Sequence, residues 1–204
     1  MDKQETLFEK ALAFAARAHA GQTRKGKETP YILHPCEAAL IVSSMTDDEE
    51  LWCAALLHDV IEDCNVSYET ICEQFGTRIA DLVRNETHEE SEDPDPMKRW
   101  KSAKRSTVDK IRNGSRDEKI VALGDKLSNI RDIERDYLKL GDKLWSRFSV
   151  QDPYAHKWYY AELVKALRDL SGMPAYEEFR TICRTVFSKA APGRQRKGDM
   201  SRSG

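Results

Sequence analysis

The segment LLHDVIED, residues 56–63, carries four titratable groups within six positions: the adjacent pair His58-Asp59 and the adjacent pair Glu62-Asp63. The preceding run EELWCAAL has apolar residues at helical spacing, so the pattern predicts one buried helix through both segments. Residues four apart share a helix face, which would stack Glu62 on His58 and Asp63 on Asp59. Because buried charges without partners are costly, this patch needs basic side chains, water or a metal ion to neutralise it.

Two residues far away in the sequence could join this patch. His34 directly precedes Pro35, which suits the first position of a helix, and Asp125 lies on the inner face of a long predicted helix, DEKIVALGDKLSNIRDIERDYL. Two imidazoles and two carboxylates form a mixed nitrogen and oxygen site that suits Mn²⁺, Fe²⁺, Co²⁺ or Zn²⁺ better than Ca²⁺. Such an ion would balance both aspartates and leave the acidic pair Glu62-Asp63 one turn away, near bound water. The spacing alone does not establish the site, because a buried histidine is more often a core or capping residue.

Helices are the only elements that the sequence predicts. The first starts at Thr6 and stops near Gly21, and no strand-type alternation or internal repeat is present. The later helical segments, besides the two described above, are PCEAALIV, SYETICEQF, TRIADLVRNE, MKRWKSAKRSTVDKIRNG, YAHKWYYAELVKALRDL and AYEEFRTICRTVF. The acidic, proline-containing stretch at 88–96 is typical of an exposed, mobile loop, and the Gly-, Ser- and Arg-rich tail at 189–204 of disorder. We therefore expect an all-α fold.

Composition limits the class of protein further. A chain of 204 residues that is 40% hydrophobic can bury one sizeable core, and a net charge of −2 argues against coating DNA or an anionic membrane. Five cysteines without a CxxC pair are typical of buried thiols in a reducing compartment. The charged N-terminus does not fit a signal peptide, and no apolar run reaches membrane-spanning length. We expect a soluble, cytoplasmic protein with no nucleic-acid or membrane partner; the sequence leaves its oligomeric state open.

Three motifs in order, HAGQTRKGKETPYILHP, LLHDVIED and LGDKLSNIRD, closely resemble those of the HD-domain hydrolases of the RelA/SpoT family, including the small alarmone hydrolases of the Mesh1-like type. The resemblance runs from the first helix to about residue 138. It implies a single HD-domain helical bundle over residues 1–188, followed by the tail. This chain stops at Gly204, so the resemblance implies hydrolysis without the synthetase domain of longer relatives.

The resemblance also implies roles for particular residues. Its metal ligands fall on His34, His58, Asp59 and Asp125, with Mn²⁺ the usual ion and another divalent transition metal the alternative. Its catalytic carboxylates, which orient or deprotonate the attacking water, fall on Glu62 and Asp63. Its substrate contacts fall on Arg24 and Lys25, near the nucleotide base, and on Asn129, near the ribose. Without a ligand, the basic loop would be an ordinary solvated turn, and Asn129 would bond a neighbouring backbone group.

The implied reaction is hydrolysis of guanosine tetraphosphate or pentaphosphate, (p)ppGpp, at the ribose 3′ position with release of pyrophosphate. Lys25, Lys27 and Lys104 could attract this polyanionic, small-molecule nucleotide. Three alternatives stay open. The substrate could be another nucleotide, such as an adenosine alarmone or the 2′-phosphate of NADPH; the protein could bind nucleotide without catalysis; or residues 98–112 could form a nucleic-acid-binding helix, which the acidic loop beside it disfavours.

Several positions depart from the family pattern. Related sequences often have alanine at Gly124 and threonine at Val60 or Cys64, and the acidic loop differs from their VTDD-like stretch. None of these departures removes a ligand or a catalytic carboxylate. They concern the choice of substrate, because loops at a pocket edge commonly set it.

Overall fold

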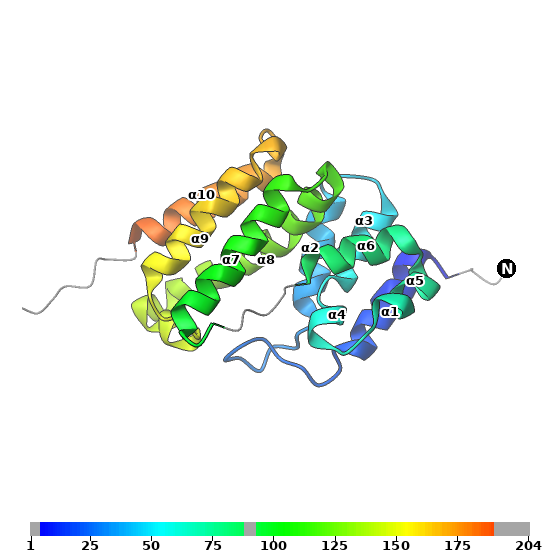
Figure 1. Cartoon of the computed structure of the whole chain (residues 1–204), viewed down its shortest axis with the longest axis horizontal. Helices are drawn as coiled ribbons and strands as arrows, with labels where there is room; N and C mark the ends of the chain where they lie inside the picture. The colour runs from blue at the N-terminus through cyan, green and yellow to red at the C-terminus, as the bar shows by residue number, and fades with distance from the viewer. Residues whose placement is uncertain (1–4, 88–92, 190–204) are drawn as a thin grey trace, which may run out of the picture.

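The computed structural model describes residues 5–87 and 93–189, and within them the chain is all-helical (Figure 1). Pairing of β type in this part is limited to one isolated bridge between Thr23 and Pro30. The expected all-α fold is confirmed. Residues 88–92 of the predicted acidic loop and 190–204 of the predicted tail lie outside the described residues. In the described ranges no helix combines the length and apolar character that crossing a membrane requires.

Two helices of the N-terminal half begin at the capping residues that the sequence indicates, whereas the second helix begins two residues before the predicted first position, Pro35. Thr6 caps α1 in a reciprocal capping box with Glu9, and Ser67 caps α5 through the backbone N–H of Thr70. The helices of this half are α1 (Leu7–Ala18), α2 (Leu33–Ser43), α3 (Glu49–Leu57), α4 (Val60–Asp63), α5 (Tyr68–Phe75) and α6 (Thr77–Glu86). Helix α2 starts before Pro35, so His34 lies inside its first turn.

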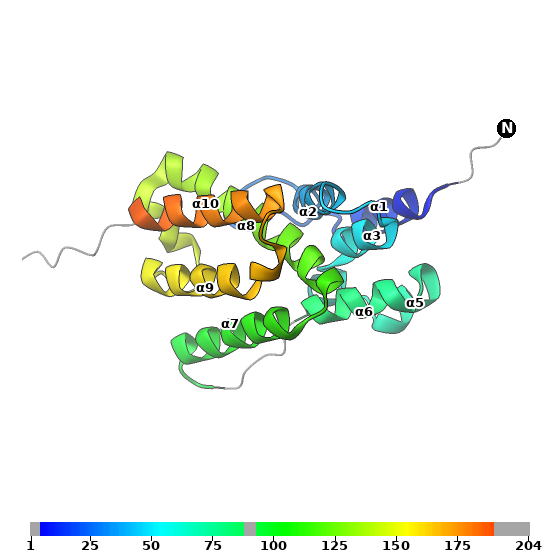
Figure 2. The same ribbon diagram turned by 90° about the horizontal axis from the view of Figure 1, so that it is seen from above.

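The C-terminal half is built around one long helix. Its elements are α7 (Pro96–Asn113), α8 (Arg116–Leu140), the 3₁₀ helix η1 (Gly141–Arg147), α9 (Pro153–Ala166), the 3₁₀ helix η2 (Arg168–Leu170) and α10 (Pro174–Lys189). Helix α8 packs against α2 and α3 from the first half and against α7 and α10 from the second. It therefore joins the two halves, as Figure 2 shows from above. The sequence pattern does not predict η1.

The prediction of one continuous helix through LLHDVIED is wrong. Helix α3 ends at Leu57 and α4 begins at Val60, with Asp59 at φ −100° and ψ −3° between them. The imidazole Nδ1 of His58 lies 2.8 Å from the carbonyl oxygen of Ala55. In an unbroken helix that oxygen would accept the backbone N–H of Asp59, so the side chain replaces a helical hydrogen bond and the chain turns there.

Helices α2 and α8 approach each other closely at Gly124. A Cβ atom at this position would lie 2.7 Å from Cγ2 of Val42 and 2.9 Å from the carbonyl oxygen of Ala38. Glycine is therefore required for this helix-to-helix distance. Because His34 lies on α2 and Asp125 directly follows Gly124, this contact brings two of the predicted ligands together.

Candidate metal centre and its cavity

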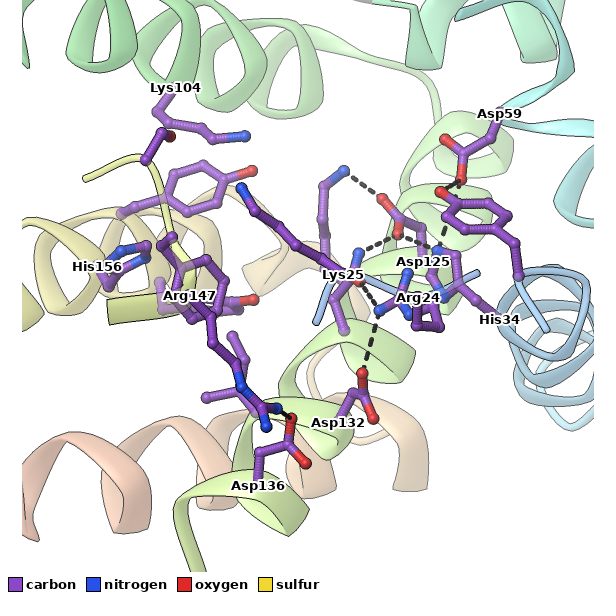
Figure 3. Close-up of a pocket in the computed structure, with 18 of the residues that line it drawn as sticks. Arg24, Lys25, His34, Asp59, Lys104, Asp125, Asp132, Asp136, Arg147 and His156 are labelled. Carbon is purple, nitrogen blue, oxygen red and sulfur yellow. Dashed lines mark hydrogen bonds and ion pairs between the residues drawn. The ribbon is translucent and has the colours of Figure 1, made fainter. Parts of the chain in front are cut away.

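The four predicted ligands meet at one point, although they come from α2, from the turn between α3 and α4, and from α8 (Figure 3). The Nε2 atom of His34 lies 3.2 Å from Oδ1 of Asp125 and 3.7 Å from Oδ2 of Asp59. The Nε2 atom of His58 lies 2.9 Å from Oδ2 of Asp59 and 3.6 Å from Oδ1 of Asp125. Atoms that bind one ion at about 2.1 Å lie roughly 3 to 4 Å apart, so these separations match a shared cation.

A group of three, His34, His58 and Asp59, has all its ligand atoms within 4.8 Å of one another. Within the described residues, Nε2 of His58 is buried without a hydrogen-bond partner, despite the nearby carboxylate of Asp59. Its Nδ1 faces the Ala55 carbonyl, which only accepts hydrogen bonds, so Nδ1 carries a proton and the Nε2 lone pair points at the carboxylates. Lone pairs that face one another in a buried site require a cation, and this donor set fits a divalent transition metal.

The charges around the centre favour ionised aspartates. Burial would raise the pKa of Asp125, but Lys126 and both histidines outweigh it and hold that pKa well below its ordinary value. Burial likewise would lower the pKa of His58, but Asp59 and Asp125 raise it well above the usual range. Without a metal ion, Asp59 and Asp125 therefore favour a proton on Nε2 of His58, in the place of the lone pair that would bind the metal. Lys126 is buried and also lies 3.5 Å from Glu86.

Tyr31 is a site residue that the sequence reasoning missed. Its hydroxyl donates a 2.7 Å hydrogen bond to Oδ2 of Asp59, and its ring lies beside those of His19 and His34. Burial and the charge of Asp59 raise the pKa of Tyr31, so its hydroxyl keeps the proton that it donates. The available signal was its place three residues before His34 in the motif TPYILHP.

The centre forms one end of a cavity of about 490 Å³. Glu62 and Asp63 are exposed on its wall, at the C-terminal end of α4. Burial and the carboxylates of Asp59 and Glu62 raise the pKa of Asp63, which makes this group a better proton acceptor than an ordinary aspartate. The structure therefore brings the acidic pair to the same cavity as the four predicted ligands.

The basic loop between α1 and α2 crosses the cavity and is held by α8. Arg24 donates a 2.8 Å hydrogen bond to Oδ1 of Asn129, so two predicted substrate contacts touch each other. Lys27 pairs with Asp132 at 2.6 Å and with Asp136 at 2.9 Å. Lys25 also lines the cavity but forms no ion pair with any residue in 5–87 or 93–189. It is the cation of this loop that stays available for an anionic ligand.

Further cations lie across the cavity from the metal centre, as Figure 3 shows for Lys104 and Arg147. Lys104 projects from α7, and burial together with the charge of Lys126 lowers its pKa. Arg147, the last residue of η1, pairs with Asp136 at 2.9 Å. The sequence reasoning missed Arg147, because no local pattern marks a 3₁₀ helix as part of a site.

Comparison with known proteins identifies the family of the chain. The sequence profile of the HD domain family matches residues 11–150. The chain is 37% identical to the guanosine-3′,5′-bis(diphosphate) 3′-pyrophosphohydrolase MESH1 of Xenopus tropicalis, over 82% of this chain and 88% of that protein. It is 36% identical to human MESH1 over the same shares of the two chains.

The fold matches as well. The solved structure of a metazoan ortholog of SpoT that hydrolyzes ppGpp superposes with a TM-score of 0.70 and 27% identity, and the match covers 91% of this chain and 98% of that one. The family profile includes His34, His58, Asp59 and Asp125 within its bounds. The chain therefore belongs to the HD domain family and is an HD phosphohydrolase homologous to the MESH1 proteins.

Proposed function

We propose that the protein is a divalent-metal-dependent (p)ppGpp 3′-pyrophosphohydrolase, with Mn²⁺ as its ion. The main support is one cavity that has convergent histidine and aspartate ligands at one end and cationic side chains at the other. Guanosine 3′,5′-bis(diphosphate) carries a diphosphate on each side of its ribose. A molecule of this kind would place its 3′ diphosphate at the metal and direct its 5′ diphosphate toward the opposite cations. The similarity to MESH1 proteins supports the same substrate.

In this proposal His34, His58, Asp59 and Asp125 hold the ion. Tyr31 fixes the carboxylate of Asp59 by its 2.7 Å hydrogen bond. A bound divalent ion would lower the pKa of a water molecule toward neutrality and screen the phosphoryl charge. The water oxygen forms a bond to the phosphorus that carries the ribose 3′ oxygen, and the bond between that phosphorus and the 3′ oxygen breaks. The 3′ oxygen takes up a proton and becomes the 3′-hydroxyl of GDP or GTP, and the phosphorus leaves as part of pyrophosphate.

The acidic pair and the cations have separate tasks. Glu62 and Asp63 orient the water and accept its proton, for which the raised pKa of Asp63 is suitable. The Arg24–Asn129 pair and Lys25 lie beside the nucleoside part of the substrate. Lys104 and Arg147 balance the charge of the second diphosphate.

A nucleotide panel tests the proposal directly. Metal-free protein is incubated with Mn²⁺ and, separately, with ppGpp, pppGpp, an adenosine alarmone and NADPH, and the products are separated by chromatography. We expect GDP and pyrophosphate from ppGpp, GTP and pyrophosphate from pppGpp, and no turnover in the presence of a chelator. The matched control is Asp59→Ala, which should be inactive on every substrate.

Other results of the panel would select another function. Consumption of NADPH or of the adenosine nucleotide alone would replace the guanosine assignment while keeping the metal chemistry. Tight binding of ppGpp without product, in protein shown to contain metal, would identify a non-catalytic nucleotide-binding protein.

A further inference from the structure

A chain of hydrogen bonds leads from the metal centre through His34 to the opposite face of α2 and α8. On the side away from the centre, Nδ1 of His34 lies 2.9 Å from Oγ of Ser128. The hydroxyl of Ser128 donates in turn to Oε2 of Glu37 at 2.8 Å. Ser128 is 1% exposed and His34 4% exposed, so the bond between them is shielded from solvent, whereas the side chain of Glu37 is 24% exposed. The three residues belong to α2 and α8, the two helices that meet at Gly124.

The direction of these bonds determines where His34 carries its proton. An ionised carboxylate only accepts hydrogen bonds, so the single hydrogen of the Ser128 hydroxyl is used for Glu37. The Oγ atom of Ser128 can then only accept from Nδ1 of His34. Nδ1 therefore carries the proton, and Nε2 presents its lone pair to Asp59 and Asp125.

Arginines keep Glu37 ionised and in place. Its Oε1 lies 3.4 Å from Arg131 and its Oε2 lies 3.4 Å from Arg135. Burial would raise the pKa of Glu37, but Ser128 and the two arginines outweigh it and lower that pKa. Arg131 is itself oriented by Glu178 of α10, which accepts two hydrogen bonds of 2.7 Å from the guanidinium. The carboxylate of Glu37 is thus held by three residues of α8, and one of them, Arg131, is fixed in turn by α10.

We propose that Ser128 and Glu37 are positioning residues that fix His34 in the Nδ1–H form, so that Nε2 is ready to bind the metal ion. Neither residue lines the cavity that contains the metal centre. The inference rests on the proposed metal centre, and it adds the two residues that are hydrogen-bonded in series behind His34. Partners of this kind orient metal-bound histidines, and their removal lowers metal affinity by about 10- to 100-fold. His58 uses the carbonyl of Ala55 for the same purpose.

The first test reads the tautomer without any metal. Protein with ¹⁵N-labelled histidine is freed of metal, and long-range ¹H–¹⁵N spectra are recorded at a pH at which His34 is neutral. The signals of His34 are identified by their loss in His34→Gln. We expect a protonated Nδ1 and an unprotonated Nε2 in the wild type. In Ser128→Ala and in Glu37→Gln the population should shift toward the Nε2–H form.

The second test measures the affinity for Mn²⁺ alone by calorimetry. We expect Ser128→Ala and Glu37→Gln to bind Mn²⁺ about 10- to 100-fold more weakly than the wild type. Glu177→Gln is the matched control, because it makes the same carboxylate-to-amide change on α10, where Glu177 pairs with Arg180 and contacts neither Arg131 nor Ser128. It should keep the wild-type affinity and tautomer. Circular dichroism establishes whether each variant is folded. If Ser128→Ala does not fold, the test rests on Glu37→Gln, because Glu37 is only half-buried.

Two results would overturn the inference: an Nε2–H form of His34 in the wild type, or wild-type Mn²⁺ affinity in folded variants of both positions. A wild-type protein that binds no divalent ion would instead contradict the proposed function. In that case the tautomer spectra still decide between the two assignments of the His34 proton.

Discussion

At the scale of single residues, we propose that different groups hold the ion and handle the water. Asp59 faces both histidine Nε2 atoms, at 2.9 and 3.7 Å, whereas Glu62 is exposed on the cavity wall. Asp59→Ala should therefore abolish both metal binding and activity. Glu62→Gln should keep Mn²⁺ affinity but lower turnover by about 10²- to 10⁴-fold, the usual contribution of a general base. Calorimetry and pyrophosphate release measure the two effects, and undiminished turnover in Glu62→Gln would show that its role is misassigned.

Glu37 gives a prediction about pH. Its pKa in the folded protein is lowered, so its contribution to stability is fully present above its unfolded pKa of about 4.3 and is lost as pH falls through the lower folded value. In metal-free protein at pH 7, Glu37→Gln should lower the free energy of unfolding by about 1 kcal/mol. The difference from the wild type should shrink below pH 4. Urea unfolding at several pH values measures it; a difference that grows on acidification would contradict the assignment.

The sequence allowed prediction of all four converging side chains, because the motifs around them are local. It did not allow prediction of Tyr31, Ser128 or Glu37. Their hydrogen bonds join residues 28 to 94 positions apart, and no spacing rule links such pairs before the fold is known. The roles of the converging residues remain predictions, which the variants above test.

At the scale of helices, the contact at Gly124 sets the distance between α2 and α8. Gly124→Ala would gain about 1 kcal/mol of helix propensity but place a Cβ atom 2.7 Å from Val42 and 2.9 Å from the Ala38 carbonyl. Overpacking of this kind costs about 1 to 3 kcal/mol. We expect a net loss of about 1 kcal/mol in unfolding free energy, with weaker Mn²⁺ binding because α8 carries Asp125 away from His34. Chemical unfolding and calorimetry measure the two quantities.

A double-mutant cycle with Val42→Ala isolates the cause. Removing the Val42 methyl groups relieves the nearer of the two contacts, so Gly124→Ala should cost less in that background. An equal cost in both backgrounds would show that the Val42 contact does not limit the approach of the helices.

Helix boundaries were largely predictable, since capping residues mark them. Thr6, Ser67 and Gly76 all lie at helix ends in the structure. The break between α3 and α4 and the 3₁₀ helix η1 were not predictable. The break depends on a side-chain bond from His58 to the carbonyl of Ala55, and apolar periodicity continues across it. Apolar periodicity indicates which residues are buried, but it does not indicate where the backbone leaves the helix.

At the scale of the whole molecule, the proposed ion would join α2, the turn after α3 and α8. Binding to the folded state alone adds stability, about 2.7 kcal/mol at a free ion concentration 100 times Kd. For a chain of this size that corresponds to a rise in Tm of roughly 5–10 °C. Thermal unfolding with Mn²⁺ and with a chelator measures this rise. Asp59→Ala should show no rise, and equal stabilisation of that variant would place the ion elsewhere.

The interruption between Leu57 and Val60 has a consequence for how the His-Asp pair can work at all. Consecutive side chains of a regular α-helix diverge by about 100° around the axis, too far apart to share one small target. The break between α3 and α4 removes this divergence, so the side chains of His58 and Asp59 point toward the same place. A variant that made α3 and α4 one continuous helix would therefore lose metal binding, although all four ligand residues would still be present in its sequence.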